Sequence, residues 1–593
     1  MQSGTFSSQQ SLPNLEIPSI EETIERYLKS VSVVVSAEKL DEITKLTNSF
    51  KISPDYKLLQ DFLLMKAENE KNWLESWWYD AYTANRESLI TQNMGGIIPK
   101  IETKHSQITV AASMIYHMMS YWTLVRQEKI EITKSRGVTW DMDQVYNLFN
   151  ASRIPELPID RIVRFFKTES EGTCPSHVVI LCNGNIWKLN VLNSDGSVKP
   201  IPAIVKALEL IKKKSAKQNY QSIVPLTTLA RDEWAKIRNS IETNSKHNTN
   251  NFGVIDSAVF SLTLSDDIVE KESQLMKYSL FGSAFNSYCD KNLNLIVLRD
   301  GRACLQAEHG NVDAISLFAP CDYAADKLNN QIMSESHNDF CVVEELKFQT
   351  TADLSKIVNE AEKKFEIVAN KYNVEVFHYT NFASLYCKKQ KIYADTIIQI
   401  ALQLAYFKTH RKLAPTYETA STRKFYHGRT ETVRSLTPAV AKFILAVDIG
   451  ATNDVTRTLF FDAYNAHNTL MDFAREGKGI DRHLFGLKMA EICLADLNIK
   501  TSISFLEDES FSKSGGNGNF KLSTSLLGYS ENGVFGFVTP MCVDGYGSFY
   551  RINNDRFSFT LTSSQQDGTD IKMFRENLES TLNFIKNKIL PSD

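Results

Sequence analysis

Short runs of β-branched and aliphatic residues alternate with segments of helical spacing, and this alternation limits the possible folds more than any other feature of the chain. Strand-like runs bounded by turn residues occupy 177–182, 185–192, 258–264 and 292–298. A chain of 593 residues with 43% hydrophobic content is long enough for two or more domains and a large core. The sequence therefore predicts a globular α/β protein with more than one domain.

Helical spacing is clear in the first quarter of the chain. Between residues 17 and 78 apolar side chains recur every four residues, as from Ile20 to Leu28, and we expect the tryptophans of NWLESWW to pack in the core. The uncharged stretch Gln107–Val125 falls short of the roughly 18 consecutive apolar residues that a bilayer span needs. It predicts a buried helix and no transmembrane segment. The asparagine-rich stretch 245–253 predicts a surface connection.

Charge and cysteine content exclude several classes of protein. Lysine and arginine number 66 against 70 acidic residues, so no overall electrostatic footprint for nucleic acid is present. Nine scattered cysteines without CxxC spacing predict reduced thiols inside a cell and no metal site. The N-terminal stretch lacks the features of a secretory signal, and the final LPSD differs from a peroxisomal SKL address. We expect a cytoplasmic protein, with the peroxisome and the mitochondrial matrix as alternatives.

One histidine follows two consecutive strand-like runs. In NLNLIVLRDGRACLQAEHGNVDAI, beginning at residue 292, an Arg-Asp-Gly turn separates the runs, and the second run ends at Glu308-His309, with Asp313 four residues later. A hairpin can hold a histidine rigidly at its exit. By itself, however, such a histidine is usually structural.

An ordered set of motifs in the second half of the chain raises the significance of His309. The segments are KLAPTYETASTRKFYHGRTETVRS from residue 412, GKGIDRHLFGLK from 477, KLSTSLLGY from 521 and DGYGSFYRI from 544. With the EH motif before them, they resemble the motifs of the carnitine/choline acyltransferase family, in the family's order. The resemblance covers nearly the whole chain and is greatest to members that transfer medium or long acyl chains to carnitine.

The resemblance implies a fold and a division of the chain. Family members have two domains, each like chloramphenicol acetyltransferase, with mixed sheets, flanking helices and an active-site tunnel at the domain interface. Here residues 1–95 would be a helical segment packed on the C-terminal domain. Residues 96–352 would carry the catalytic base, and residues 353–593 would carry the contacts to both substrates and the acyl chain.

The resemblance also implies reversible transfer of an acyl group between coenzyme A and the carnitine hydroxyl, without an acyl-enzyme. A neutral imidazole near pH 7 suits removal of the hydroxyl proton, which makes His309 the general base. By family analogy Asp313 holds the imidazole, and Ser525 donates to the oxyanion of the tetrahedral intermediate. The strand period of two places Ser523 and Ser525 on the same face.

Family positions also predict the substrate contacts. Carnitine has a carboxylate that choline lacks, and the resemblance assigns that carboxylate to Arg482, with Tyr417, Thr430 and Thr432 beside it. The expected coenzyme A contacts are Lys388, Lys391 and Asp395, with Lys389 between the two lysines. Gly536 stands where acetyl-specific members carry a methionine, which implies an open acyl channel and a medium or long chain.

Other functions stay open. A choline or acetyl-specific transferase is the nearest alternative, opposed by Arg482 and Gly536. A non-catalytic protein that senses acyl-CoA is an alternative of another class, because family resemblance does not establish turnover. A serine hydrolase is disfavoured, since the sequence has no GxSxG motif. We expect a monomer with carnitine and acyl-CoA as its substrates, no nucleic-acid partner and no permanently bound cofactor.

Overall fold

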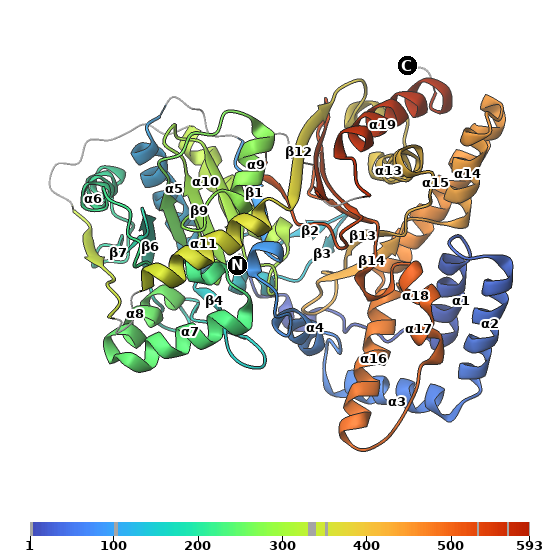
Figure 1. Cartoon of the computed structure of the whole chain (residues 1–593), viewed down its shortest axis with the longest axis horizontal. Helices are drawn as coiled ribbons and strands as arrows, with labels where there is room; N and C mark the ends of the chain where they lie inside the picture. Colours follow the sequence, from blue (N-terminus) through green and yellow to red (C-terminus); the bar gives the residue numbers. More distant parts are fainter. Residues whose placement is uncertain are drawn as a thin grey trace.

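Two mixed β-sheets, one in each half of the molecule, form the framework of the fold (Figure 1). The structure is a computed structural model and describes residues 4–99, 105–329, 340–349, 354–529, 533–565 and 568–591. The predicted α/β class, with mixed sheets and flanking helices, is confirmed. The predicted domain boundary at 352–353 falls outside the described residues.

The first sheet has eight strands and the second has six. In spatial order the first contains β11 (Val342–Glu345), β7 (Asn185–Asn190), β6 (His177–Cys182), β8 (Ser261–Leu264), β9 (Leu293–Val297), β10 (Ala303–Ala307), β1 (Met94–Ile97) and β16 (Phe535–Phe537). The second contains β12 (Tyr372–Tyr379), β18 (Phe557–Ser564), β17 (Tyr546–Ile552), β15 (Leu522–Leu526), β13 (Thr416–Ser421) and β14 (Thr430–Arg434). Two small hairpins pair β2 (Lys134–Ser135) with β3 (Val138–Thr139) and β4 (Ala151–Ile154) with β5 (Arg161–Arg164).

Helices connect and cover the sheets. Up to residue 329 the helices are α1 (Ile20–Val31), α2 (Ala37–Lys51), α3 (Pro54–Asn69), α4 (Glu75–Thr83), α5 (Gln107–Arg126), α6 (Ile201–Lys214), α7 (Arg231–Asn244), α8 (Lys246–Ser257), α9 (Glu272–Phe281) and α10 (Ala314–Asn329). Those after it are α11 (Leu354–Ala369), α12 (Ser384–Lys389), α13 (Ala394–His410), α14 (Pro438–Asp448), α15 (Asn453–Arg475), α16 (Asp481–Asp496), α17 (Ser504–Glu507), α18 (Glu509–Lys513) and α19 (Ile571–Phe584). Short 3₁₀ or π segments are η1 (Gln9–Ser11), η2 (Leu89–Thr91), η3 (Asp143–Asn147), η4 (Val224–Thr228), η5 (Gly516–Gly518) and η6 (Ile585–Ile589).

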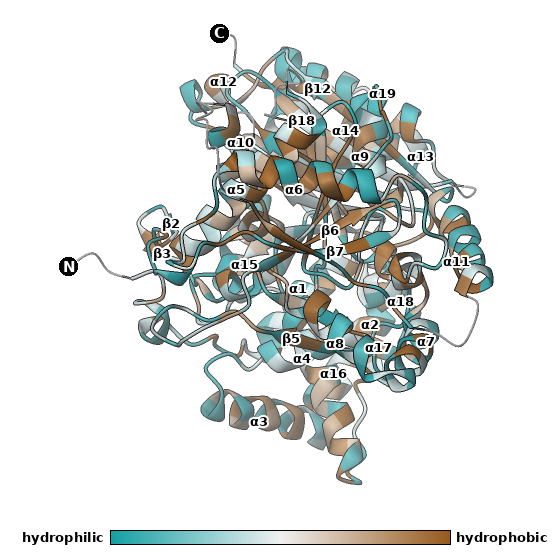
Figure 2. Cartoon of the chain, turned by 90° about the vertical axis from the view of Figure 1, so that its left-hand side faces the viewer, coloured by the Kyte–Doolittle hydropathy of each residue, from teal (hydrophilic) through white to brown (hydrophobic). Residues whose placement is uncertain are grey.

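Helices cover the first sheet on both faces, which explains why its central strands are buried at every position. In β6, Val178 and Ile180 contribute to a core with α5 and α6, whereas Val179 and Leu181 contribute to a core with α7, α8 and α11. A strand buried on both faces has no polar alternation to show. The hydropathy colouring in Figure 2 shows β6 and β7 as brown strands in the interior.

The second sheet has one face covered by helices and one that faces the first half. Leu522, Tyr550 and Phe559 pack in a core with α13, α14, α15 and α19. The parallel pairs β13–β15 and β15–β17 place the strands that carry the TYETA, STS and DGYG motifs side by side. Side chains that alternate away from the helices therefore gather on the other face.

The N-terminal helices pack on part of the second half. Ile24, Leu59 and Trp73 share a core with Leu487 and Phe505, which come from α16 and α17. In Figure 1 the blue helices α1, α2 and α3 lie beside the orange helices α16, α17 and α18. The predicted division at residues 95 and 352 stays a prediction.

One strand pairing joins the two halves directly. β16, which lies far along the chain, pairs with β1 at the edge of the first sheet, with Gly536 opposite Gly96. A Cβ atom on Gly536 would lie 2.1 Å from the backbone oxygen of Gly95. Glycine at this position therefore permits the close approach of the two strands.

Two element predictions have clear outcomes. Gln107–Val125 is the buried helix α5, which begins at Ser106, whose hydroxyl accepts a hydrogen bond from the Thr109 amide. The surface connection predicted at 245–253 is wrong, because these residues belong to α8. Its asparagines Asn248 and Asn251 are buried and donate to backbone carbonyl groups, so the polar composition does not prevent packing. Among the described residues no helix is long and apolar enough to cross a membrane.

Candidate active site

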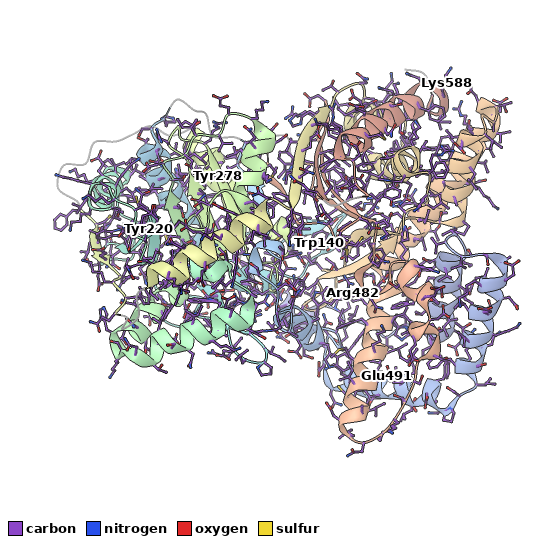
Figure 3. All side chains as sticks on the ribbon, viewed as in Figure 1. Trp140, Tyr220, Tyr278, Arg482, Glu491 and Lys588 are labelled. Carbon is purple, nitrogen blue, oxygen red and sulfur yellow. The ribbon has the colours of Figure 1, made fainter. Side chains whose placement is uncertain are left out.

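A cavity of about 590 Å³ lies between the two sheets and is lined from both halves of the molecule. His309 and Trp140 come from the first half, and Arg482 and Ser525 come from the second. Figure 3 shows Trp140 and Arg482 near the boundary between the halves. The structure therefore brings together the predicted base, the predicted oxyanion donor and the predicted acceptor cation. A continuous tunnel through this boundary stays a prediction.

The position of His309 defines which ring nitrogen can act as a base. His309 follows β10 at the end of the predicted hairpin, and its Nδ1 lies 3.0 Å from the carbonyl oxygen of Val312. Because a carbonyl only accepts, Nδ1 carries the proton and the lone pair is on Nε2. Burial lowers the pKa of His309 below its ordinary value, Asp313 opposes this shift, and the Arg429 guanidinium adds to it. A neutral imidazole at pH 7 follows.

Asp313 contacts an arginine rather than the imidazole. Its two carboxylate oxygens accept from Arg429 Nη2 at 2.9 Å and Nε at 3.0 Å, and a further bond comes from Gln144 Nε2 at 2.9 Å. The same guanidinium donates to the backbone oxygens of Gly310 and His309 at 2.8 and 3.1 Å. Arg429 thus holds the whole loop from His309 to Asp313. The predicted orienting role of Asp313 stays a prediction, and the contacts support it only through the loop.

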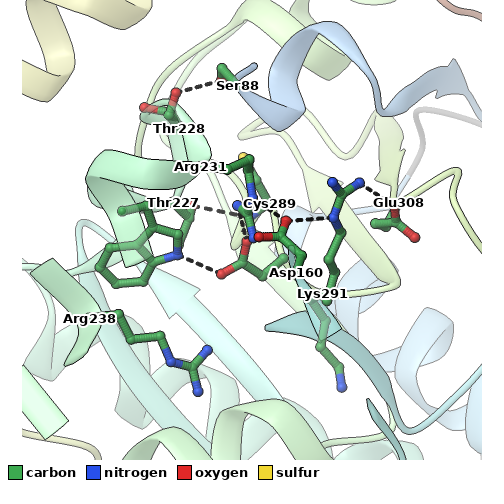
Figure 4. A network of polar contacts seen from close by, with 12 residues as sticks. Ser88, Asp160, Thr227, Thr228, Arg231, Arg238, Cys289, Lys291 and Glu308 are labelled. Atoms are coloured by element: carbon green, nitrogen blue, oxygen red, sulfur yellow. Dashed lines mark hydrogen bonds and ion pairs between the residues drawn. The ribbon is translucent and has the colours of Figure 1, made fainter. Parts of the chain in front are cut away.

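A buried polar network contacts the other side of the loop from His309 to Asp313 (Figure 4). Glu308 accepts from the Gly310 amide at 2.9 Å and from Arg153 at 3.3 Å. Arg153 also pairs with Asp160 at 2.7 Å, and the chain of ion pairs continues from Asp160 through Arg231 to Asp290. These ion pairs tie the loop to β4 and α7, while Glu308 Oε2 and Arg231 Nη2 have no hydrogen-bond partner among the described residues.

The four predicted acceptor residues form one cluster. Arg482, in the first turn of α16, donates to the Tyr417 hydroxyl at 3.1 Å, the Thr430 hydroxyl at 3.2 Å and the Thr432 hydroxyl at 3.4 Å. Its side chain is only 7% exposed. In the part of the chain that the structure describes, no carboxylate lies within ion-pair distance of the Arg482 guanidinium: Asp481 pairs with Arg434, and Glu431 accepts from the Arg482 backbone amide at 3.3 Å. The site can therefore receive an anionic group.

The serines of the STS motif line the same cavity. Ser523 and Ser525 both lie on β15 and line the cavity, but Thr524 and Leu526 line it as well, so the alternation of faces stays a prediction. Thr524 donates to the Tyr417 carbonyl at 2.9 Å and accepts from Gln399 at 2.9 Å. These bonds anchor β15 to β13 and α13, so that the hydroxyl of Ser525 projects from a fixed strand.

Comparison with known proteins agrees with this geometry. A family model described as Choline/Carnitine o-acyltransferase matches residues 15–580. The chain belongs to the choline/carnitine acyltransferase family. The peroxisomal carnitine O-octanoyltransferase of Bos taurus is 34% identical over 570 residues, covering 93% of this chain and 92% of the relative. The Homo sapiens protein of that name is 33% identical, covering 93% and 92%. Human carnitine O-acetyltransferase is 27% identical, covering 94% and 90%.

Family membership confirms the resemblance and the enzyme class, whereas the predicted coenzyme A contacts stay predictions. Lys388 and Lys391 are exposed around the end of α12. Asp395 is buried in the first turn of α13 and accepts from the Tyr550 hydroxyl at 2.6 Å. Burial, with the nearby charge of Glu418, raises the pKa of Asp395 to about 6. The structure thus directs this carboxylate inward, away from the exposed lysines.

The sequence analysis did not single out two residues that line the cavity, Arg429 and Trp78. Arg429 lies within the recognised GRTETVRS segment, so its basic residue could have been singled out, although its partner Asp313 is distant in the sequence. Trp78, expected in the core, packs against it and also lines the cavity, with its ring centroid 3.9 Å from the guanidinium carbon of Arg482. Nothing in the local pattern separates Trp78 from its buried neighbour Trp77.

One group of residues has the side chains that a metal site would need. Glu75, Asp143 and His427 have ligand-type atoms within 4.8 Å of one another. His427 Nδ1 lies 2.9 Å from Glu75 and its Nε2 lies 3.5 Å from Asp143. The two carboxylates therefore engage opposite ring nitrogens, an arrangement that an ion-pair cluster explains without a metal.

Proposed function

We propose that this protein transfers a medium-length acyl group, in the octanoyl range, reversibly between coenzyme A and the hydroxyl of L-carnitine. The observation that carries the proposal is the position of His309. Its Nδ1 proton is donated to the Val312 carbonyl, which leaves the lone pair of Nε2 free. His309 lines the same cavity as Arg482, a buried arginine without an ion-pair partner among the described residues. A base for a hydroxyl and a cation for a carboxylate are the two groups that a hydroxy acid such as carnitine requires.

The reaction follows from the protonation state of His309. Nε2 removes the proton from the carnitine hydroxyl as its oxygen attacks the thioester carbonyl. Ser525 donates to the resulting oxyanion. Collapse of the tetrahedral intermediate breaks the carbon–sulfur bond, and the departing thiolate takes the proton from His309. The enzyme ends in its starting state without an acyl-enzyme.

Carnitine rather than choline is the proposed acceptor. Arg482 with Tyr417, Thr430 and Thr432 offers a cation and hydroxyl groups for a carboxylate. Choline has no group that would compensate the buried charge of Arg482, and an unpaired buried charge is unfavourable.

Chain length is proposed from the relatives and from Gly536. The relatives at 33–34% identity are carnitine O-octanoyltransferases, and Gly536 lines the cavity without a side chain.

We propose that Lys388, Lys391 and Asp395 contribute to the binding of coenzyme A, with acyl-CoA as a substrate and no resident cofactor. The relatives are named as peroxisomal proteins, so we propose the peroxisome as a location in addition to the cytosol. We propose that the protein is a monomer.

The test is a matrix of substrates with identification of the product. Acetyl-CoA, octanoyl-CoA and palmitoyl-CoA are each incubated with carnitine or choline, and the ester is identified by mass spectrometry. The proposal expects octanoylcarnitine to form with the highest kcat/KM. Preferential formation of acetylcarnitine or acetylcholine would instead establish the alternative transferase, and absence of any ester would favour acyl-CoA sensing.

A further inference from the structure

The β2–β3 hairpin carries an arginine at an unusual backbone position. Ser135 pairs with Val138, and the two residues between them, Arg136 and Gly137, have φ angles of 50° and 82°. Positive φ at both central residues defines a turn that favours Asn-Gly, because a side chain with a Cβ atom is disfavoured there. The hairpin tip therefore has an arginine where asparagine would be easier to accommodate. Such a strained position suggests a function for the guanidinium group.

The hairpin extends from the wall of the reaction cavity to the other half of the molecule. Trp140, directly after β3, lines the cavity and donates its backbone amide to the Thr133 carbonyl at the hairpin base. At the tip, the guanidinium of Arg136 lies 5.4 Å from the ring centroid of Tyr393. Tyr393 belongs to the second half, immediately before α13. In Figure 1, β2 and β3 lie near the boundary between the two halves.

The surroundings of Arg136 are open to solvent and include further basic side chains. Arg136 and Tyr393 are both exposed. Within the described ranges of the chain, Arg136 has no carboxylate partner at ion-pair distance, and the exposed Lys391 lies only two residues from Tyr393. Tyr529 lies within electrostatic reach of Arg136, of Arg475 and of Asp395. Side chains from separate parts of the chain thus meet near the start of α13.

We propose that Arg136 binds a phosphate group of the coenzyme A nucleotide. The first half of the molecule would thereby add one cation to Lys388 and Lys391 of the second half. This inference rests on the proposed function, since it assigns the nucleotide of that substrate to this region. An arginine offers two parallel donors to a phosphate, which a lysine does not. The ring of Tyr393 supports the guanidinium by a cation–π contact and leaves its donors available.

A simpler role for Arg136 would be to hold the halves together through Tyr393. The two roles differ in what they predict for shortened substrates. A phosphate contact is lost when the substrate has no nucleotide, whereas a structural contact affects every substrate equally.

The experiment compares Arg136→Gln with the wild type on octanoyl-CoA and on S-octanoyl-pantetheine, with carnitine as acceptor. The proposal expects the KM for octanoyl-CoA to rise about 10-fold, as for loss of one charge-assisted contact. The kcat, the KM for carnitine and the KM for the pantetheine thioester should not change. The difference between variant and wild type should shrink as the KCl concentration is raised. Arg161→Gln, an exposed arginine of the same half, is the matched control.

Arg136→Asn separates the phosphate contact from the turn, because asparagine tolerates the backbone conformation. It should keep or raise the melting temperature and still raise the KM for octanoyl-CoA. An unchanged KM for octanoyl-CoA in both variants, or an equal rise with the pantetheine thioester, would overturn the proposal. If the wild type gives no turnover, the proposed function fails. Calorimetric titration with coenzyme A alone then decides the inference, which requires weaker binding by Arg136→Gln.

Discussion

At the residue scale, the environment of His309 predicts the pH dependence of the reaction. Burial and the nearby Arg429 lower the pKa of His309, although Asp313 opposes the shift. The base is active only when neutral, so activity is lost as the pH falls through this lowered pKa. We expect the acidic limb of the kcat/KM profile below the ordinary value of about 6.5. Asp313→Asn removes the opposing charge and should move the limb to still lower pH. A wild-type limb above 6.5 would contradict this account.

We predict that the choice of acyl acceptor depends on Arg482. Arg482→Gln removes the buried cation, and we expect the KM for carnitine to rise about 100-fold, equivalent to about 3 kcal/mol. The KM for octanoyl-CoA in the same variant is the internal control and should stay constant. A comparable rise for both substrates would show that Arg482 supports the fold rather than the carboxylate.

Gly536 is both a cavity residue and a packing residue. Because a Cβ atom would lie 2.1 Å from a backbone oxygen of β1, Gly536→Ala forces the strands that join the halves apart. We expect a loss of about 1–3 kcal/mol in the free energy of unfolding, measured by urea denaturation, together with lower octanoyl transfer. Gly253→Ala is the control, since nothing lies within 4 Å of its added Cβ on α8. Equal stability of the two variants would sink the packing argument.

At the scale of elements, a polar network lies behind the substrate face of the second sheet. Glu418 on β13 accepts from His467 of α15 at 2.6 Å and from Ser435 at 2.7 Å. The Ser435 hydroxyl oxygen also lies 3.1 Å from Gln399 Oε1 of α13, and Gln399 Nε2 donates to Thr524 beside Ser525. The network therefore links the two covering helices to the strands that present Tyr417 and Ser525 to the cavity.

Loss of His467 tests this network. His467→Ala leaves the buried carboxylate of Glu418 without its charged partner, and we expect a loss of about 3 kcal/mol. Although burial lowers it, the pKa of His467 stands above its ordinary value because of Glu418. Its contribution is therefore full below about pH 6.5 and is lost as the pH rises through the raised pKa. Chemical denaturation at several pH values should show this trend relative to Asn465→Ala, an exposed position on α15. If the loss of stability in His467→Ala, relative to Asn465→Ala, grew as the pH rises, the result would refute this account of the His467–Glu418 pair.

The sequence supports some elements better than others for physical reasons. The helix α5 and the hairpin β9–β10 follow from local apolar pattern and turn residues. The helix α8 does not, because the bonds that satisfy Asn248 and Asn251 are made to backbone groups distant in the sequence, such as Gln349 and Lys347. Element type is predictable where local spacing determines burial. The prediction fails where residues distant in the sequence satisfy the polar side chains.

At the scale of the whole molecule, the cavity exists only because distant segments meet. Motif order identified His309, Arg482 and Ser525 from the sequence through family resemblance. Neither periodicity nor composition could place β16 beside β1, or Arg429 on the loop of Asp313, since these contacts join segments far apart in the chain. The positions of single functional residues were therefore accessible from the sequence, whereas the pairs that hold them required the structure.

The central claim is that His309 acts as the general base for transfer to carnitine. The most direct test measures release of the coenzyme A thiol from octanoyl-CoA, with and without carnitine, for the wild type and His309→Ala. The account predicts carnitine-dependent release by the wild type and a loss of at least about 100-fold in the variant, with unchanged binding of coenzyme A. Release that persists in His309→Ala, or that does not depend on carnitine in the wild type, would contradict it.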